Sequence, residues 1–197
     1  MIETRGPFCS VFMALSQDGF MARPDGALDW LDEANRLVPL GEDCGFADFM
    51  ARVDALVMGR KTFDTVRSMG VWPYGDKPVV VLSRRLKNLP EGMPGSVRLD
   101  GGDPHEVLER TSALGWQRLY IDGGETVQGF LKAGRVHELV LTEVPCVLGQ
   151  GIALFDPAGL PAGFQCQRQH AYPFGFVQRQ YLLQANQQDL MVRKALP

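Results

Sequence analysis

Short apolar runs that do not alternate with polar residues are the feature that most constrains the fold of this chain. They occur at residues 11–15, 55–58, 79–82, 119–121 and 139–141. Strands that are apolar on both sides are typical of a largely parallel sheet with helices on each face. The runs therefore predict the core strands of an α/β fold.

Two helices between these runs have clear ends. Asp103 as N-cap, Pro104 at the first helical position and Gly115 as terminator bracket one of them. The other is expected over residues 125–133, directly after the glycine pair at 123–124. A strand, a glycine turn and a helix in immediate succession make a suitable anion site.

The C-terminal part of the chain is expected to form an antiparallel hairpin. Segments 164–171 and 176–183 flank the turn sequence Tyr-Pro-Phe-Gly at 172–175. The order of the elements predicts one domain over residues 1–197, with a mostly parallel sheet and this hairpin at its edge. The polar tail, residues 185–197, is expected to be flexible unless it packs on a neighbouring molecule.

Charge and composition exclude several classes of function. The 20 basic and 23 acidic residues give a net charge of -3, and Lys and Arg are not clustered, so no nucleic-acid partner is expected. No apolar run is long enough for a membrane span, and the N-terminus lacks a signal-peptide pattern, so we expect a cytoplasmic protein. The four cysteines are widely separated, so we expect neither a disulfide framework nor a metal site.

The cofactor motifs most common in α/β proteins do not occur in this sequence. The Gly-x-Gly at 149–151 lacks the third glycine and the helix of a Rossmann fingerprint. There is no Walker loop and no Gly-x-Ser-x-Gly elbow. The His-Glu pairs at 105–106 and 137–138 lack the sequence context of a zinc deaminase.

Three strand ends carry groups that suit a phosphate. They are Gly59-Arg60-Lys61-Thr62, Ser83-Arg84 and Gly123-Gly124-Glu125-Thr126. Glycine lets backbone approach a ligand, and cations on the first turn of a helix oppose its dipole, so a bound anion would relieve that conflict. Ligands of open α/β sheets also bind at the carboxyl ends of strands. Taken singly, each motif fits a solvated basic turn or a plain tight turn as well.

The ordered set of these motifs resembles the dihydrofolate reductases and their relatives, the reductase domains of bifunctional riboflavin-biosynthesis deaminase-reductases. Other matching segments are 13–20, with Ser-x-Asp-Gly after the first strand, and 142–145 with 149–155 beyond it. The resemblance covers residues 8–183. It implies a dihydrofolate reductase-like three-layer α/β fold and an NADPH-dependent reductase.

The resemblance also implies roles for individual residues. The pyrophosphate of the cofactor would be contacted by Gly59, Thr62, Gly123, Gly124, Glu125 and Thr126. Its adenosine end would be contacted by Arg60, Lys61, Ser83 and Arg84. Ala14 would lie against the nicotinamide. Since cations can pair with the adenosine 2′-phosphate, NADPH is favoured over NADH.

The chain departs from the riboflavin-type pattern after Thr62. Those reductases continue with an Asp-x-Pro-x-Leu-Thr-x-Arg segment that grips the substrate, whereas this chain runs through residues 62–70 to Trp72 and Pro73. The departure leaves the substrate open. A fused zinc deaminase half is also missing, so we expect a stand-alone reductase-like chain.

A reductase needs a proton donor beside the acceptor, because hydride transfer must be matched by a proton on the atom that gains electrons. Asp18 and Asp32 are the predicted catalytic residues. Asp18 follows the first strand, and Asp32 lies where the resemblance places the substrate-binding acid. Burial against an aromatic ring would raise such a pKa toward neutrality. The alternatives are that residues 18–19 form a turn and that Asp29 caps a short helix ending near Val38.

Three functions stay open on the sequence alone. Two are enzymes, a pteridine or pyrimidine reductase and a reductase of an unrelated small carbonyl or imine. The third is a catalytically silent nucleotide-binding homodimer. A homodimer is expected because the strand at 176–183 places apolar residues on both faces at the sheet edge.

Overall fold

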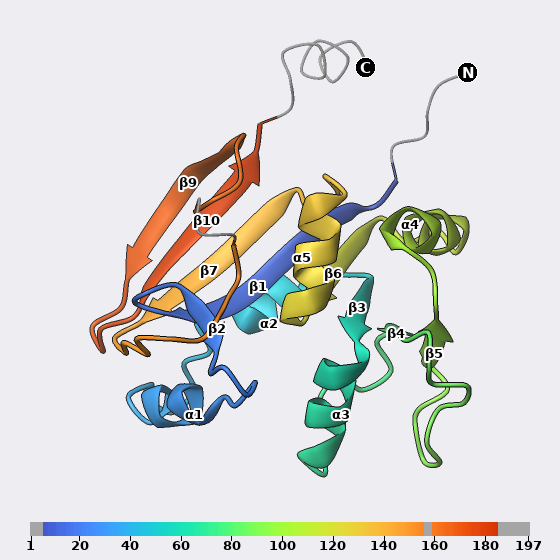
Figure 1. Ribbon diagram of the computed structural model, residues 1–197, viewed down its shortest axis with the longest axis horizontal. Coiled ribbons are helices and arrows are strands. Elements are labelled where there is room, and N and C mark those ends of the chain that lie inside the picture. Colours follow the sequence, from blue (N-terminus) through green and yellow to red (C-terminus); the bar gives the residue numbers. More distant parts are fainter. Residues whose placement is uncertain (1–5, 156–158, 185–197) are drawn as a thin grey trace.

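The computed structural model describes residues 6–155 and 159–184, and its centre is an eight-stranded sheet with the order β5-β4-β3-β6-β1-β7-β10-β9. The strands from β5 to β7 are parallel, and β10 runs antiparallel to both of its neighbours (Figure 1). The strands are β1 (Phe8–Ser16), β3 (Ala55–Gly59), β4 (Val79–Leu82), β5 (Val97–Asp100), β6 (Arg118–Asp122), β7 (Glu138–Val144), β9 (Phe164–Ala171) and β10 (Val177–Leu183). The predicted α/β sheet with a C-terminal hairpin is confirmed, whereas the tail at 185–197 lies outside the described residues.

Helices cover both faces of the sheet. They are α1 (Asp29–Asn35), α2 (Phe46–Ala51), α3 (Arg60–Ser68), α4 (Pro104–Ala113) and α5 (Gly124–Lys132). Val107 of α4 and Phe130 of α5 belong to the core on one face, and Phe49 of α2 and Phe63 of α3 to the core on the other. The three-layer arrangement is therefore confirmed. Among the described residues, no helix is long and apolar enough to cross a membrane.

Strand β3 shows why the apolar runs do not alternate. Ala55 and Val57 point into the core under α4 and α5, whereas Leu56 and Met58 point into the core under α2 and α3. All four are fully buried. A strand covered on both faces needs an apolar side chain at every position.

The chain connections diverge between the neighbouring strands β3 and β6. Helix α3 leads from β3 outward to β4, whereas α5 leads from β6 past β1 to β7. The two helices lie on opposite faces of the sheet. This is a topological switch point, and open α/β sheets bind ligands in the crevice beyond the carboxyl ends of such strands.

The predicted helix boundaries agree with the structure where neighbouring residues in the sequence mark the helix ends, and agree less well elsewhere. The helix predicted after Asp103 and the one predicted over 125–133 are α4 and α5. Asp29 does not cap the first helix but is its first residue, after Leu28 as N-cap. Helix α2 and the small antiparallel pair β2 (Phe20–Ala22) and β8 (Ile152–Ala153) were not predicted, because segments this short carry no periodic pattern.

Strand β10 is not the edge strand that the sequence suggested. It lies between β7 and β9, so β9 forms this end of the sheet (Figure 1). Residues 165–171 of β9 are exposed. The stated reason for a homodimer is therefore wrong. The homodimer itself stays a prediction.

Candidate functional site

The turns β3–α3 and β6–α5 interlock at the switch point. A Cβ atom added to Gly59 would lie 2.7 Å from Thr126 Oγ1, and one added to Gly123 would lie 2.1 Å from Thr62 Oγ1. Gly123 also has φ of 85°, a conformation that favours glycine. Each turn thus provides the space for the threonine of the other, and this interlock brings the N-termini of α3 and α5 together.

Both helix N-termini are open. The N-caps are Gly59 and Gly123, and neither helix has a side-chain cap. The first-turn amides therefore have no partner from their own cap residue. Among the described residues, none forms a hydrogen bond with the hydroxyl of Thr62 or Thr126. Unpaired amides, free hydroxyls and side-chain-free glycines on two facing helices fit a pyrophosphate.

Two of the three cations predicted to bind phosphate, Arg60 and Lys61, lie on the first turn of α3 at this crevice. Arg60 forms an ion pair with Asp64, with 3.5 Å between NH1 and Oδ2. Lys61 reaches across to α5, where its Nζ lies 2.6 Å from Glu125 Oε1. Arg84 is exposed and has no ion-pair partner among the described residues. The motifs of α3 and α5 are thus brought together, although Lys61 and Glu125 engage each other.

Ser83 stabilises the turn that follows β4. Its Oγ accepts hydrogen bonds from the backbone N–H groups of Arg85 (3.3 Å) and Leu86 (2.9 Å). Its own N–H donates to the carbonyl of Asp100 at 2.8 Å. Ser83 therefore orders the segment that carries Arg84, and the predicted contact with the adenosine end stays a prediction.

The small sheet β2–β8 covers the start of α5. A Cβ atom added to Gly124 would lie 2.3 Å from Met21 Sδ, so the Met21 side chain of β2 packs directly against the helix backbone at this glycine. The Gln128 side chain of α5 donates to the backbone carbonyl of Ala153 at 2.9 Å. The segment after β1 is thus held over the crevice.

Asp18 anchors this segment and is not the buried acid that was expected. It is exposed, and its carboxylate accepts hydrogen bonds from Ser16 Oγ (2.7 Å), Leu148 N (3.1 Å) and Gly149 N (2.7 Å). Desolvation is the largest single effect and raises the pKa of Asp18, but the hydrogen bonds together outweigh it and lower the pKa. Asp18 is therefore an exposed loop anchor rather than a buried acid, and its role as proton donor stays a prediction.

A cavity of about 540 Å³ lies beside the carboxyl ends of β1 and β7. Ala14 and Thr142, paired on these strands, line it together with Phe12. Leu31 and Asn35 of α1 form another part of its lining. Asp32, on the same helix, is exposed and does not line the cavity. The structure therefore brings Ala14, but neither predicted aspartate, to the cavity.

Asp122, at the carboxyl end of β6, is the acid that the sequence reasoning missed. It shares a sheet face with Tyr120, which belongs to the same core as Phe12 of the cavity wall. The Asp122 side chain is half-buried, and desolvation raises its pKa, an effect that hydrogen bonds from Gly123 N–H and Tyr120 offset only in part.

Tyr120 is the polar neighbour of Asp122. Its hydroxyl donates to the backbone carbonyl of Phe12 at 3.0 Å and also interacts with the Asp122 carboxyl. Donation from the tyrosine lowers the pKa of Asp122 and so opposes desolvation, which is the larger effect. The net shift of the Asp122 pKa is therefore upward, toward the protonated form.

A signal for Asp122 was present in the sequence. An acidic residue ends a buried strand directly before the Gly123-Gly124 pair, yet only the glycines were interpreted. Thr142 belongs to segment 142–145, which resembles the family, but the sequence predicted no role for this residue. Among the described residues, no group of three or more His, Cys, Asp and Glu side chains could hold a metal ion.

Comparisons with known proteins agree with this geometry. The family model of the RibD C-terminal domain matches residues 7–177. A crystal structure from Shewanella sp. PV-4, named for riboflavin biosynthesis, is 38% identical to this chain and has a TM-score of 0.82. The alignment covers 90% of this chain and 99% of the Shewanella chain. The same fold occurs in the Thermotoga maritima diaminohydroxyphosphoribosylaminopyrimidine deaminase/5-amino-6-(5-phosphoribosylamino)uracil reductase, which is 12% identical and has a TM-score of 0.68. The alignment covers 91% of this chain and 57% of the Thermotoga chain.

A curated relative leads to the same family. The Bacillus subtilis (strain 168) protein YwjB is 34% identical over 74% of this chain and 80% of its own length. The ordered motifs, the sheet order and the family match all point in one direction. The chain belongs to the RibD C-terminal domain family, whose relatives include riboflavin-pathway reductases with a dihydrofolate reductase-like fold.

Proposed function

We propose that this protein is an NADPH-dependent reductase of a small acceptor. The observation that carries the proposal is the pair of open helix N-termini, built around Gly59 and Gly123, at the switch point of the sheet. Thr62 and Thr126 would hold the pyrophosphate with the first-turn amides, and Arg60 and the cations near Ser83 would hold the 2′-phosphate. When bound, the cofactor would supply hydride from the C4 atom of its nicotinamide.

The chain's own residues would position the acceptor and deliver a proton. Ala14 and Thr142 line the cavity at the carboxyl ends of their strands, beside the crevice. Asp122, whose pKa is raised by desolvation, would donate a proton to the nitrogen or oxygen of the acceptor that gains electrons. Tyr120 would hold the carboxyl in place through the hydrogen bond that it shares with Asp122.

The cavity lining favours a flat acceptor that is not strongly anionic. Three aromatic rings line it, those of Phe12, Phe46 and Phe176. Glu42 and Asp43 also line it, whereas Lys, Arg and His are absent from its described lining. We therefore propose a pyrimidine- or pteridine-like ring, or a carbonyl or imine on a similar scaffold. The raised pKa of Asp122 on this face favours an enzyme over a catalytically silent nucleotide-binding protein.

Cofactor titration tests the nucleotide assignment. Arg60→Ala should weaken NADPH by about 1.5 to 3 kcal/mol, because it removes a charge-assisted contact with a phosphate that NADH lacks. NADH affinity should change much less. Arg67→Ala, which removes the cation in the last turn of the same helix, is the matched control. Equal weakening of both cofactors by Arg60→Ala would assign Arg60 elsewhere, and failure of the wild-type protein to bind NADPH would overturn the proposed function.

Turnover tests the proton donor. Asp122→Asn should slow the reduction of an accepted substrate by about 10²- to 10⁴-fold while NADPH affinity stays nearly constant, since only proton delivery is lost. Asp32→Asn, at an exposed carboxylate away from the cavity lining, should leave the rate within a few-fold. A normal rate for Asp122→Asn would show that the proton comes from water or another group.

We also propose that the protein acts as a cytoplasmic homodimer. The support is β9, an eight-residue strand at the end of the sheet whose outer edge is not paired with any described strand. Such an edge favours association. Light scattering at micromolar concentration should show about twice the 21.8 kDa mass of the chain, and a single species of 21.8 kDa would refute the dimer.

A further inference from the structure

The two open helix N-termini are bridged by an ion pair. Lys61 is the second residue of α3, and Glu125 is the second residue of α5. Their Nζ and Oε1 atoms are 2.6 Å apart, and both side chains are 78% exposed. Because α3 and α5 belong to opposite layers, the pair spans the mouth of the crevice above β3 and β6.

Charge explains why this pair forms. The first turn of α3 contains two cations, Arg60 and Lys61, and no acidic residue. Cations at a helix N-terminus oppose its dipole, and an anion there relieves the conflict. Glu125 provides that anion from the facing helix, while it also complements the dipole of α5. The pair adds little stability in itself, because both groups are well solvated.

We infer that the Glu125 carboxylate is a resident anion that competes with the phosphates of the cofactor for Lys61 and for the two helix N-termini. The inference rests on the proposed function, since it concerns the same crevice. A carboxylate cannot donate to a pyrophosphate, so Glu125 contributes at most its backbone amide to the cofactor. Its side chain lowers cofactor affinity and must be displaced on binding.

The sign of one substitution separates this inference from its rival. If Glu125 competes with the ligand, Glu125→Gln should lower the Kd for NADPH about three- to tenfold at low ionic strength, and the gain should shrink as salt screens the charges. If Glu125 instead holds Lys61 in position for a phosphate, the same substitution should raise the Kd. Lys61→Met should raise the Kd for NADPH in either case. It is the positive control, because a raised Kd shows that NADPH binds at this crevice.

A matched control excludes a general charge effect. Glu109→Gln removes one negative charge from the exposed face of α4, so it changes the net charge of the chain by the same amount. It should leave the Kd within twofold. Fluorescence titration with NADPH measures all four proteins. A Kd for Glu125→Gln that is unchanged or higher, or an equal gain with Glu109→Gln, overturns the inference while leaving the proposed function intact. Absence of NADPH binding by the wild-type protein overturns the proposed function and the inference with it.

Discussion

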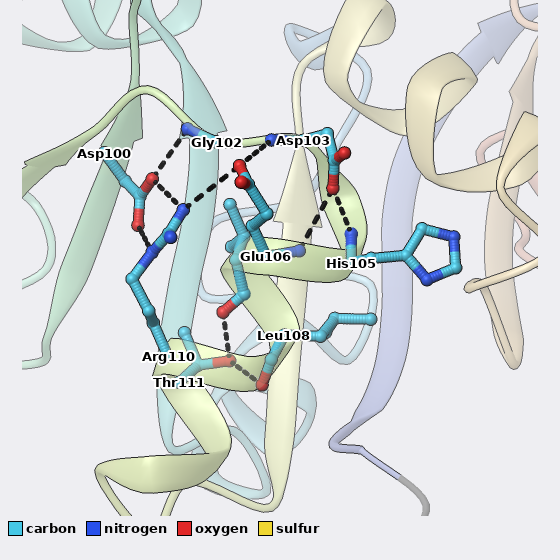
Figure 2. A network of polar contacts seen from close by, with 9 residues as sticks. Asp100, Gly102, Asp103, His105, Glu106, Leu108, Arg110 and Thr111 are labelled. Carbon is cyan, nitrogen blue, oxygen red and sulfur yellow. Dashed lines mark hydrogen bonds and ion pairs between the residues drawn. The ribbon is translucent and has the colours of Figure 1, made fainter.

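Helices α3, α5 and α4 all begin at the carboxyl end of a parallel strand, but α4 is built in the opposite way from the other two. Asp103 Oδ1 accepts hydrogen bonds from the backbone N–H groups of His105 (2.9 Å) and Glu106 (3.0 Å), and Glu106 Oε2 accepts from Asp103 N at 3.1 Å (Figure 2). At α3 and α5 the cap residues are glycines, which have no side chain to accept a hydrogen bond.

The region around α4 is also closed by ion pairs. Arg110 donates to both carboxylate oxygens of Asp100 at 2.7 Å each, and Asp100 Oδ1 accepts from Gly102 N at 2.8 Å (Figure 2). The polar groups of this turn thus satisfy one another within residues 100–111. The comparison teaches that the fold can close a helix N-terminus at the sheet edge with its own acids. The fold leaves the N-termini of α3 and α5 without a side-chain cap, and these two N-termini face each other.

The largest effect is expected from disturbing the open pair. Gly123→Ala should destabilise the protein by about 2 to 4 kcal/mol, because it combines a left-handed backbone with a collision of the new methyl group with Thr62. Urea unfolding measures the loss.

The control for this substitution lies at the end of the closed helix. Gly115 has nearly the same backbone, with φ of 82°, but a Cβ atom there would meet nothing within 4 Å. Gly115→Ala should therefore cost only about 1 kcal/mol, the price of the backbone alone. Equal losses at the two glycines would mean that the interlock of the two turns contributes nothing.

A smaller effect should separate stability from binding. Asp103→Ala should lower the Tm by about 2 to 6 °C, because α4 loses its capping box, and should not change NADPH affinity. Thr62→Ala should do the reverse, weakening NADPH about three- to tenfold with a nearly constant Tm, since its hydroxyl is unpaired within the described structure. Calorimetry and cofactor titration of both variants check this, and a common loss of stability and affinity would erase the distinction between the two regions.

The smallest effect is a difference in pH dependence. The hydrogen bonds and ion pair with Arg110 outweigh burial and lower the pKa of Asp100, so its contribution to stability is present above its unfolded pKa and is lost as the pH falls through the lowered value. Burial raises the pKa of Asp122, so its contribution is complete below its unfolded pKa and is lost as the pH rises through the raised value.

Two variants report these opposite trends. The free energy of unfolding of wild type minus that of Asp100→Asn should shrink as the pH falls below the unfolded pKa of about 4, and the same difference for Asp122→Asn should shrink as the pH rises above that value. Urea unfolding at pH values on both sides of this pKa measures both. Parallel trends would show that Asp122 is ionised in the folded protein.

The closed region was predictable from sequence, and the open one only in part. Asp103 and Glu106 cap α4 from three positions apart, so their spacing alone predicts the helix start. Gly59 and Thr126 meet only through the fold. The hydrogen bonds of Asp18 were not predictable for the same reason, because the amides that bind it lie 130 and 131 residues further along the chain.

The raised pKa of Asp122 also depends on tertiary structure. Desolvation raises it and the hydrogen bond from Tyr120 opposes that rise, and the spacing of residues in the sequence indicates neither effect. The layers and the sheet were therefore predictable from the sequence, whereas the environment of Asp122 needed the assembled fold.

The interlock of the two turns also restricts how this site can evolve. Positions 59 and 126 form one linked pair, and positions 62 and 123 form the other. A side chain at 123 would meet Thr62, and one at 59 would meet Thr126, so a change at either glycine depends on the residue at its partner position. Descendants of this chain should therefore keep the two glycines, or replace one of them only after its partner threonine has changed.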